Sequence, residues 1–322
     1  MSARRRRFAL ALALALGVPA TPATVHAQAG GAAKPAARVL AVGPARELKT
    51  PSAAARIAQR GDVIEIDPGA YADCAVWRAD NLTIRGGGKV HVKDVSCDGR
   101  GIWIIWGRNT TIDGIEFSGA DVQNNNGAAI VHEGVNMVVR NSHFHDNEQG
   151  ILTAHKSDSM VTVIDSRFER NGKCEPECAH GIYAGRIRSL RVFGSIFREQ
   201  HVGHHIKSRA LYTEVVGCHL EDGLKGTASY VINLPNGGDA VIRQNYLQKG
   251  PNAHNRMALI SIGEEGASNP GKGYRIEGNT FRNDFPGATT FVRNASPQPA
   301  TLRANAFTGQ GQPLTGAGQV VK

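Results

Sequence analysis

The segment GHHIKSRA, residues 203–210, carries three basic side chains spaced two residues apart. His205, Lys207 and Arg209 alternate with apolar or small residues, and alternate residues of a strand point to the same side. One strand would therefore present an imidazole, an ammonium and a guanidinium on a single outer face. Such a set can pair with a carboxylate and transfer protons, which is acid–base chemistry on an anionic substrate.

The β-rich runs on either side align with this segment through their apolar residues. Four isoleucines form one expected interior stack: Ile182, Ile206, Ile232 and Ile260. The residue after each isoleucine then points outward, so Tyr183 and Asn233 flank Lys207 on the neighbouring strands, each about 4.8 Å away. These groups could meet around one sugar ring.

Polar loops border the same face, and they complete the predicted site. We predict catalytic roles for Lys207, Arg209, Tyr183, His205 and His180. We predict substrate contacts for Asn233, Asn236, Asn255, Glu264 and Glu265. The alternative is a solvated basic strand beside acidic turns, in which Lys207 and Arg209 pair with Glu264 and Glu265.

A six-residue phrase that recurs eight times indicates which elements position these residues. Its copies end at Phe117, Phe144, Phe168, Phe197, Leu220, Leu247, Phe281 and Phe307. The steps between copies are 23 to 34 residues. Self-similarity at such a period is typical of a solenoid, whose units bury their faces only against neighbouring units.

The fourth position of the phrase is small or polar in seven of the eight copies. Its residues are Ile115, Ser142, Ser166, Ser195, Cys218, Asn245, Asn279 and Asn305. Stacked one per turn, these side chains would form an interior column whose hydrogen bonds satisfy the backbone at a corner that water cannot reach. Cys218 would then be a buried free thiol.

This pattern resembles the right-handed parallel β-helix of the pectate-lyase-like superfamily over about residues 39–315. Residues 51–71, PSAAARIAQRGDVIEIDPGAY, are similar to the entry segment of that superfamily, a short amphipathic helix followed by a strand and a turn. Ser52 is the expected N-cap of the helix, which would cover the open end of the solenoid. We predict an all-β, single-stranded right-handed parallel β-helix with a short N-terminal capping helix. A β-sandwich fits eight near-equal units less well.

The phrases HGIYxG, GHxIKSRA, LPNGG and GEEG are similar to those of an uncharacterised branch of exported bacterial β-helix proteins. GHHIKSRA also resembles the lysine-and-arginine arrangement of alginate and dermatan lyases with this fold, in which calcium assists the substrate carboxylate. The resemblance thus suggests Ca²⁺, with oxygen ligands from Asn233 and from Glu264 or Glu265. The residues themselves identify no cofactor and fix no metal site.

The first residues predict export. Residues 1–27 have the basic start, short apolar stretch and small-residue cleavage site of a secretory signal, and the apolar stretch is too short to span a bilayer. We predict that residues 28–38 are a flexible linker and that residues 39–322 are the β-helix domain. We expect a monomer in the periplasm or outside the cell, with no membrane contact after signal removal.

Charge and cysteines agree with an exported protein that meets an anionic partner. The signal contains four of the 37 basic residues and none of the 28 acidic ones, so the mature chain has a net charge near +5. We expect a disulfide between Cys174 and Cys178. The alternative is that these two cysteines bind a metal, but the second pair of ligands that such sites need is missing. We expect another disulfide between Cys74 and Cys97, which are 23 residues, about one turn, apart.

The chemistry that best uses the predicted site is β-elimination on a uronate-containing polysaccharide. Arg209 would pair with the C6 carboxylate, and Lys207 would remove the C5 proton if its cationic neighbours lower its pKa. Tyr183 or His205 would be the acid, or share the role of base.

A non-catalytic polysaccharide-binding or cell-envelope β-helix, a C5-epimerase and a glycoside hydrolase are the alternatives, although the paired carboxylates of a hydrolase are absent. Nucleic acid is not an expected partner, because the chain has neither a basic helix nor an aromatic sheet motif.

Overall fold

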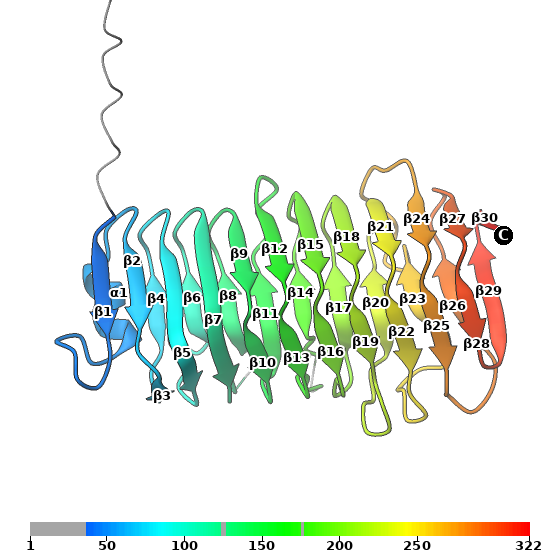
Figure 1. Cartoon of the computed structure of the whole chain (residues 1–322). Coiled ribbons are helices and arrows are strands. Elements are labelled where there is room, and N and C mark those ends of the chain that lie inside the picture. The colour runs from blue at the N-terminus through cyan, green and yellow to red at the C-terminus, as the bar shows by residue number, and fades with distance from the viewer. Residues whose placement is uncertain (1–36, 124–126, 175–176) are drawn as a thin grey trace, which may run out of the picture. The chain divides into compact units, whose positions relative to one another are not determined.

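The computed structural model describes residues 37–123, 127–174 and 177–322. These residues form an elongated parallel β-solenoid of about ten turns, from β1 at one end to β30 at the other (Figure 1). The predicted signal, residues 1–27, and most of the predicted linker, residues 28–38, lie outside the described residues. No helix of the described part is long and apolar enough to cross a membrane.

Each full turn contributes one strand to a ten-stranded sheet and two to a twenty-stranded sheet, and all strand pairings in the described residues are parallel. The ten-stranded sheet consists of β4 (Ala75–Trp77), β6 (Gly101–Ile105), β8 (Ala128–His132), β11 (Gln149–Thr153), β14 (Ile182–Ala184), β17 (His204–Ser208), β20 (Tyr230–Leu234), β23 (Ala258–Ile262), β26 (Thr289–Asn294) and β29 (Gly311–Gly316).

In the twenty-stranded sheet, a turn supplies first a middle strand and then, after a corner, an end strand. The middle strands are β1 (Val39–Val42), β2 (Val63–Ile66), β9 (Met137–Arg140), β12 (Met160–Ile164), β15 (Ser189–Phe193), β18 (Tyr212–Val216), β21 (Asp239–Arg243), β24 (Tyr274–Glu277), β27 (Ala300–Arg303) and β30 (Gly318–Val321). The end strands are β3 (Gly69–Tyr71), β10 (His143–His145), β13 (Arg167–Glu169), β16 (Ile196–Arg198), β19 (His219–Glu221), β22 (Tyr246–Lys249), β25 (Thr280–Asn283) and β28 (Ala306–Thr308). Two longer strands, β5 (Thr83–Lys93) and β7 (Thr110–Ser118), pair with both rows.

The repeated phrase forms the corner between a middle and an end strand, and its last residue packs in the core. Phe117, Phe144, Phe168 and Phe197 are stacked at centroid distances of 5.3, 4.7 and 4.6 Å, with ring planes within 12° of parallel. All four are at most 2% exposed. The stack confirms that the phrase marks one turn of a solenoid with an apolar interior.

The small polar column predicted at this corner is also present. Asn245 donates its amide to Asn279 Oδ1, and Asn279 donates in turn to Asn305 Oδ1, both at 2.9 Å. The backbone N–H of Cys218 donates to Asn245 Oδ1 at 2.8 Å, so the side chains satisfy the corner backbone of the preceding turn. Burial raises the pKa of the Cys218 thiol to about 11, as expected for a buried free thiol.

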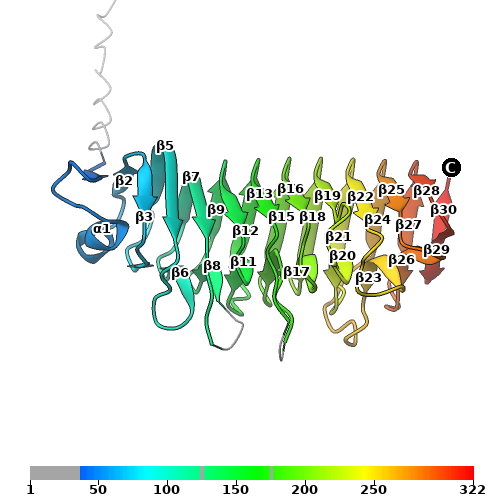
Figure 2. The same cartoon turned by 90° about the horizontal axis from the view of Figure 1, so that it is seen from below.

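Helix α1 (Pro51–Ile57) lies at the N-terminal end of the solenoid, as Figure 2 shows. The predicted N-cap, Ser52, is wrong. Pro51 occupies the first helical turn, where its missing N–H costs nothing, so the cap is Thr50, whose hydroxyl accepts from Ala53 N at 3.3 Å. Ser52 lies inside the helix, and its N–H donates to the Asp73 carboxylate at 2.7 Å.

Two disulfides are present, and both match the sequence prediction. Cys74 is bonded to Cys97, and Cys174 is bonded to Cys178. The first joins the segment before β4 to the segment before β6, which are neighbouring strands of the ten-stranded sheet. It therefore ties two successive turns together near the N-terminal end.

Candidate active site

The outer face of β14, β17, β20 and β23 has the register that the sequence predicted. Lys207 pairs with Tyr183 on one side and with Asn233 on the other, and Asn233 pairs with Ser261. The interior stack consists of Ile182, Ile206, Ile232 and Ile260, each 0% exposed. Since the side chains alternate from these isoleucines, the row that begins at Tyr183 points away from the interior stack, and its members Asn233 and Ser261 are covered by other residues.

A pocket of about 480 Å³ lies on this face. Its polar lining includes Tyr183, Lys207, Arg209, His180, His204 and Glu265. Four of these were predicted as catalytic residues and one, Glu265, as a substrate contact. The loops at the edge add Ser229 and His254.

Arg209 is the most highly connected side chain in the pocket. Its Nε donates to the Tyr183 hydroxyl at 2.9 Å, and its Nη1 lies 2.6 Å from Asn236 Oδ1 and 2.7 Å from Glu265 Oε2. Lys207 Nζ lies 5.4 Å above the Tyr183 ring centroid and 3.3 Å from the other Glu265 oxygen. Both cationic side chains are only 15% exposed.

One carboxylate therefore bridges the two cations. Burial alone would raise the pKa of Glu265, but the hydrogen bond from Arg209 and the charges of Lys207 and Arg209 outweigh it and lower the pKa. Burial opposes the charge on Arg209, yet its contacts with Glu265 and Tyr183 raise its pKa. The ion pairing that the sequence analysis gave as an alternative thus exists for Glu265.

Glu264 has different hydrogen-bond partners from those of Glu265. Its carboxylate accepts hydrogen bonds from the Asn233 amide and, at 2.9 Å, from the Ser261 hydroxyl. Asn233 is 0% exposed, and its Oδ1 is buried with no hydrogen-bond partner among the described residues. An amide oxygen without a partner is unusual for a buried asparagine.

The prediction that His205 points outward is wrong. His205 is 1% exposed, packs on the Phe197 ring and lies 2.9 Å from the buried carboxylate of Asp222. The strand pairing shows why: His204 pairs with Tyr230 and Ile206 with Ile232, and the residue between them is skipped. At this skipped position both 205 and 206 face the interior, so strict alternation fails.

The same irregularity recurs along the ten-stranded sheet. The skipped residues of other turns are buried and mostly apolar: Ile102, Ala129, Gly150, Val231, Leu259 and Phe291. His205 is therefore the histidine of an otherwise apolar interior column. That column was visible in the sequence, and it could have indicated His204 as the outward residue.

His180 and His204 present neutral imidazoles to the pocket. Their rings are stacked 4.7 Å apart with planes 12° from parallel. Burial, followed by nearby positive groups that include Lys207, lowers the pKa of both imidazoles well below the usual value. Each Nδ1 accepts a backbone N–H from the next turn, from His204 N at 3.0 Å and from Tyr230 N at 3.1 Å. The proton of each neutral ring is then on Nε2, so both rings are hydrogen-bond donors rather than bases.

Asn255, like Asn233, Asn236 and Glu264, is a predicted substrate contact that does not line the pocket. Its amide donates to the Ser229 hydroxyl at 2.6 Å, and its Oδ1 accepts from Met257 N at 2.7 Å, so it shapes the loop. Arg293 was missed by the sequence analysis. It pairs with Ser261 on β26 and continues the outer row by one strand, because Val292 takes the inward position opposite Ile260.

The oxygen donors here do not fit a calcium ion, which takes six to eight oxygen ligands. Glu264 is engaged by Asn233 and Ser261, and Glu265 is engaged by two cations. Asn233 Oδ1 is a single further donor. The donor set is too small, and it lies beside two positive side chains.

Similarity to known proteins bears on the fold of this chain. Residues 72–176 match the family model of the right-handed β-helix region. The chain is a right-handed parallel β-helix protein. The predicted fold is therefore confirmed. No curated protein matches the chain significantly.

Three solved structures are similar to this β-helix protein. An alginate lyase from Paenibacillus sp. str. FPU-7 has a TM-score of 0.58 and 17% identity, covering 84% of this chain and 94% of that one. The pectate lyase Pel9A has a TM-score of 0.55 and 12% identity, covering 87% and 78%. ORF18 of Geobacillus virus E2 has a TM-score of 0.52 and 13% identity over 81% of this chain, which spans only 54% of that protein. At these identities the likeness is one of fold.

Proposed function

We propose that this β-helix protein is an exported polysaccharide lyase that cleaves an acidic, uronate-containing polysaccharide by β-elimination. One observation carries the proposal: Tyr183, Lys207 and Arg209 meet in one pocket, where the two cations hold a single carboxylate. A lyase needs a group that neutralises the C6 carboxylate, a base for the C5 proton and an acid for O4. The signal-like residues 1–27 and the two disulfides support export.

The Glu265 carboxylate occupies the position that a substrate carboxylate needs. It belongs to the exposed GEEG turn, in which Gly263 and Gly266 have φ of +77° and +101°. Its side chain is 43% exposed, in contrast to the two cations that it contacts. A uronate would displace Glu265 and take over its contacts with Lys207 and Arg209.

The contacts of the remaining groups suggest their roles in proton transfer. Lys207 contacts a carboxylate and serves better as a proton donor than as a base. Arg209 donates to the Tyr183 oxygen, so its charge would stabilise the phenolate form in which this tyrosine can act as a base. Tyr183 would accept the C5 proton, the C4–C5 double bond would form, and the C4–O4 bond would break as Lys207 protonates O4. This assignment reverses the one made from the sequence, in which Lys207 was the base.

The outer row suits an extended polymer. Arg293 lies in the same row as Lys207, about 14 Å away by strand spacing, and the two residues between them, Asn233 and Ser261, are buried. His180 lies beside Tyr183, and His204 lies between His180 and Tyr230, so both rings border the pocket. A second uronate carboxylate could then meet Arg293 while the first is held by Arg209.

A non-catalytic polysaccharide-binding protein is the second candidate. The ion pairs of Glu265 favour it, because a lysine and an arginine neutralised by one carboxylate can be a stable surface cluster. Such a cluster could still exchange its carboxylate for that of a polymer. The two candidates differ only in bond cleavage.

Incubation with a panel of acidic polysaccharides separates the candidates. The purified protein is mixed with polymannuronate, polyguluronate, pectate and glycosaminoglycans, with calcium and with a chelator. We expect ultraviolet absorbance of a 4,5-unsaturated uronate from one polymer, at the same rate in both buffers. New reducing ends without that absorbance would mean hydrolysis, and binding without either product would leave a binding protein.

A further inference from the structure

A second cluster of ionisable side chains lies on the outer face of the end strands, several turns away from the pocket. Val92, Phe117 and Phe144 pair with one another and are 0% exposed, so the residues that flank them point outward. His91 is thereby placed beside Glu116 on the next turn. His145 follows one turn later, in the neighbouring row with Ser118.

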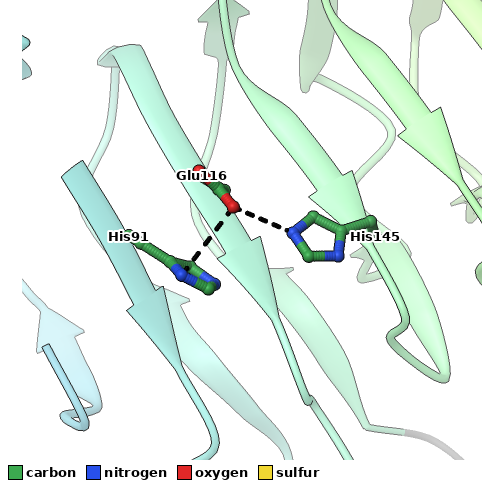
Figure 3. Close-up of side chains that lie close together, drawn as sticks. All are labelled: His91, Glu116 and His145. Atoms are coloured by element: carbon green, nitrogen blue, oxygen red, sulfur yellow. Dashed lines mark hydrogen bonds and ion pairs between the residues drawn. The ribbon is translucent and has the colours of Figure 1, made fainter. Parts of the chain in front are cut away.

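The three side chains converge on one point, as Figure 3 shows. Glu116 Oε1 lies 3.1 Å from His145 Nε2 and 3.7 Å from His91 Nδ1, and the three ligand atoms lie within 4.8 Å of one another. Around an ion with bonds of about 2.1 Å, tetrahedral ligand atoms are about 3.4 Å apart. Small side-chain rotations would bring the three atoms to that spacing.

Each histidine has its second nitrogen held by another polar group. His145 Nδ1 lies 2.6 Å from the Asp146 carboxylate, which is itself held by Arg170 through contacts of 2.9 and 2.8 Å. His91 Nε2 lies 2.7 Å from the Ser118 hydroxyl. Such partners fix the ring orientation of metal-binding histidines and raise their strength as ligands.

The contacts of His145 point to a cation between it and Glu116. Both of its ring nitrogens face carboxylate oxygens, those of Asp146 and Glu116. A neutral imidazole has one N–H and can donate to only one of them. A metal ion between Nε2 and Glu116 would satisfy this contact.

We propose that His91, Glu116 and His145 bind one divalent transition-metal ion of the zinc class. Two imidazole nitrogens with one carboxylate suit Zn²⁺ or Co²⁺, whereas Ca²⁺ and Mg²⁺ prefer oxygen ligands alone. The side chains are 21%, 22% and 15% exposed, so an ion can reach them and keep an outward coordination position. His143 is adjacent, but its Nε2 is taken by Glu169 at 3.1 Å.

The ligands come from three successive turns, β5, β7 and β10, and this predicts a consequence for stability. An ion that binds the folded chain alone stabilises it in proportion to the logarithm of its concentration above Kd. Zinc should therefore raise the melting temperature of the protein, by adding a link between the outer faces of three neighbouring strands. This site is independent of the proposed lyase activity.

Calorimetric titration of chelator-treated, tag-free protein with ZnCl₂ tests the proposal. We expect one ion per chain, a rise in melting temperature with zinc, no heat with CaCl₂, and the visible spectrum of a tetrahedral site with CoCl₂. His91→Ala and His145→Ala should each weaken zinc binding at least about tenfold. Glu116→Gln keeps the side-chain size but removes the charge. It should also weaken zinc binding, and it replaces an alanine variant that fails to fold.

His219→Ala is the matched control. His219 lies on the outer face of β19 and contacts Glu221 at 2.8 Å, but the described residues place no second histidine in a three-ligand group with it. Its zinc affinity should equal that of the native protein. The proposal is overturned if the native protein shows no saturable zinc binding, or if the binding survives loss of both His91 and His145.

Discussion

Glu265 joins Lys207 to Arg209, and its carboxylate must leave before a uronate can bind. Glu265→Gln should therefore tighten polymer binding several-fold, because it removes a competing anion from two cations that stay in place. The change is measured as KM or as a dissociation constant for the polymer.

Glu264→Gln is the control for that prediction, because Glu264 contacts Asn233 and Ser261 instead of the two cations. It should not tighten binding. If Glu265→Gln weakens binding, the carboxylate positions the cations rather than competing for them.

Lys249 is a buried lysine whose pKa is lowered by its environment. Its side chain is 1% exposed, donates to the carbonyl oxygens of Ser229 and Ala258, and has its pKa lowered by burial to about 8. Between about pH 8 and the ordinary lysine value, the unfolded chain holds a proton that the folded chain has lost. Unfolding then takes up a proton, so stability should rise with pH across this window.

Lys249→Met should remove that rise, which is at most about 3 kcal/mol for a shift of this size. Urea unfolding of both proteins from about pH 7.5 to 10.5 measures it. Parallel stability curves for the native protein and the variant would show that the lysine keeps its proton in the fold.

At the scale of elements, the strand register could be predicted from the sequence. The isoleucine stack aligned four strands, and the phrase ending in phenylalanine or leucine marked eight of the about ten turns. Alternation failed at His205, because the pairing of the ten-stranded sheet skips one position in several turns. In the sequence, this skip appears only as two consecutive apolar residues in most of these strands, a pattern that strict alternation ignores.

Loops and contacts across several turns were harder to predict. The sequence placed Glu264 and Glu265 near the basic strand, but it could not decide which of them bridges Lys207 and Arg209, because the path of a turn depends on its neighbours. The cluster of His91, Glu116 and His145 was missed, although His143 and His145 flank the core residue Phe144 as outward residues should.

The contribution of the asparagine column to stability can be measured with a single substitution. Asn279 Oδ1 accepts both the backbone N–H and the amide of buried Asn245, at 3.0 and 2.9 Å. Asn279→Ala leaves both donors unsatisfied and should lower the free energy of unfolding by about 2–4 kcal/mol.

Asn109 provides the matched comparison, because its amide donates to Asn81 in a similar ladder on the exposed surface. Asn109→Gly, which suits the φ of +55° there, should cost less than about 1 kcal/mol. Equal losses in thermal or urea unfolding would contradict the role given to burial.

For the whole molecule, stability depends on contacts between successive turns, because a solenoid has few contacts between distant turns. The Cys74–Cys97 disulfide closes a segment with a sequence separation of 23 and joins two turns. Cys74→Ser with Cys97→Ser should lower stability by about 3 kcal/mol in oxidising buffer and have little effect after reduction. An unchanged melting curve in oxidising buffer would show that the bond adds nothing to the fold.

The elongated shape also places the proposed catalytic face along many parallel strands, which is the geometry that an extended polymer needs. The central claim is that Tyr183, Lys207 and Arg209 act together on this face. A matched surface group exists on the twenty-stranded sheet, where Arg191 lies 5.6 Å from the Tyr212 ring and 3.6 Å from Glu214.

The most direct test is the initial rate of unsaturated-uronate formation by Tyr183→Phe, Lys207→Ala, Arg209→Ala and Arg191→Ala, on the polymer that the native protein cleaves. We expect losses of at least about a hundredfold for the first three variants, typical of a lost acid–base group, with folded spectra and melting temperatures retained. Arg191→Ala should cleave at the native rate. Native rates for the three site variants, or no elimination on any uronate polymer by the native protein, would contradict the account.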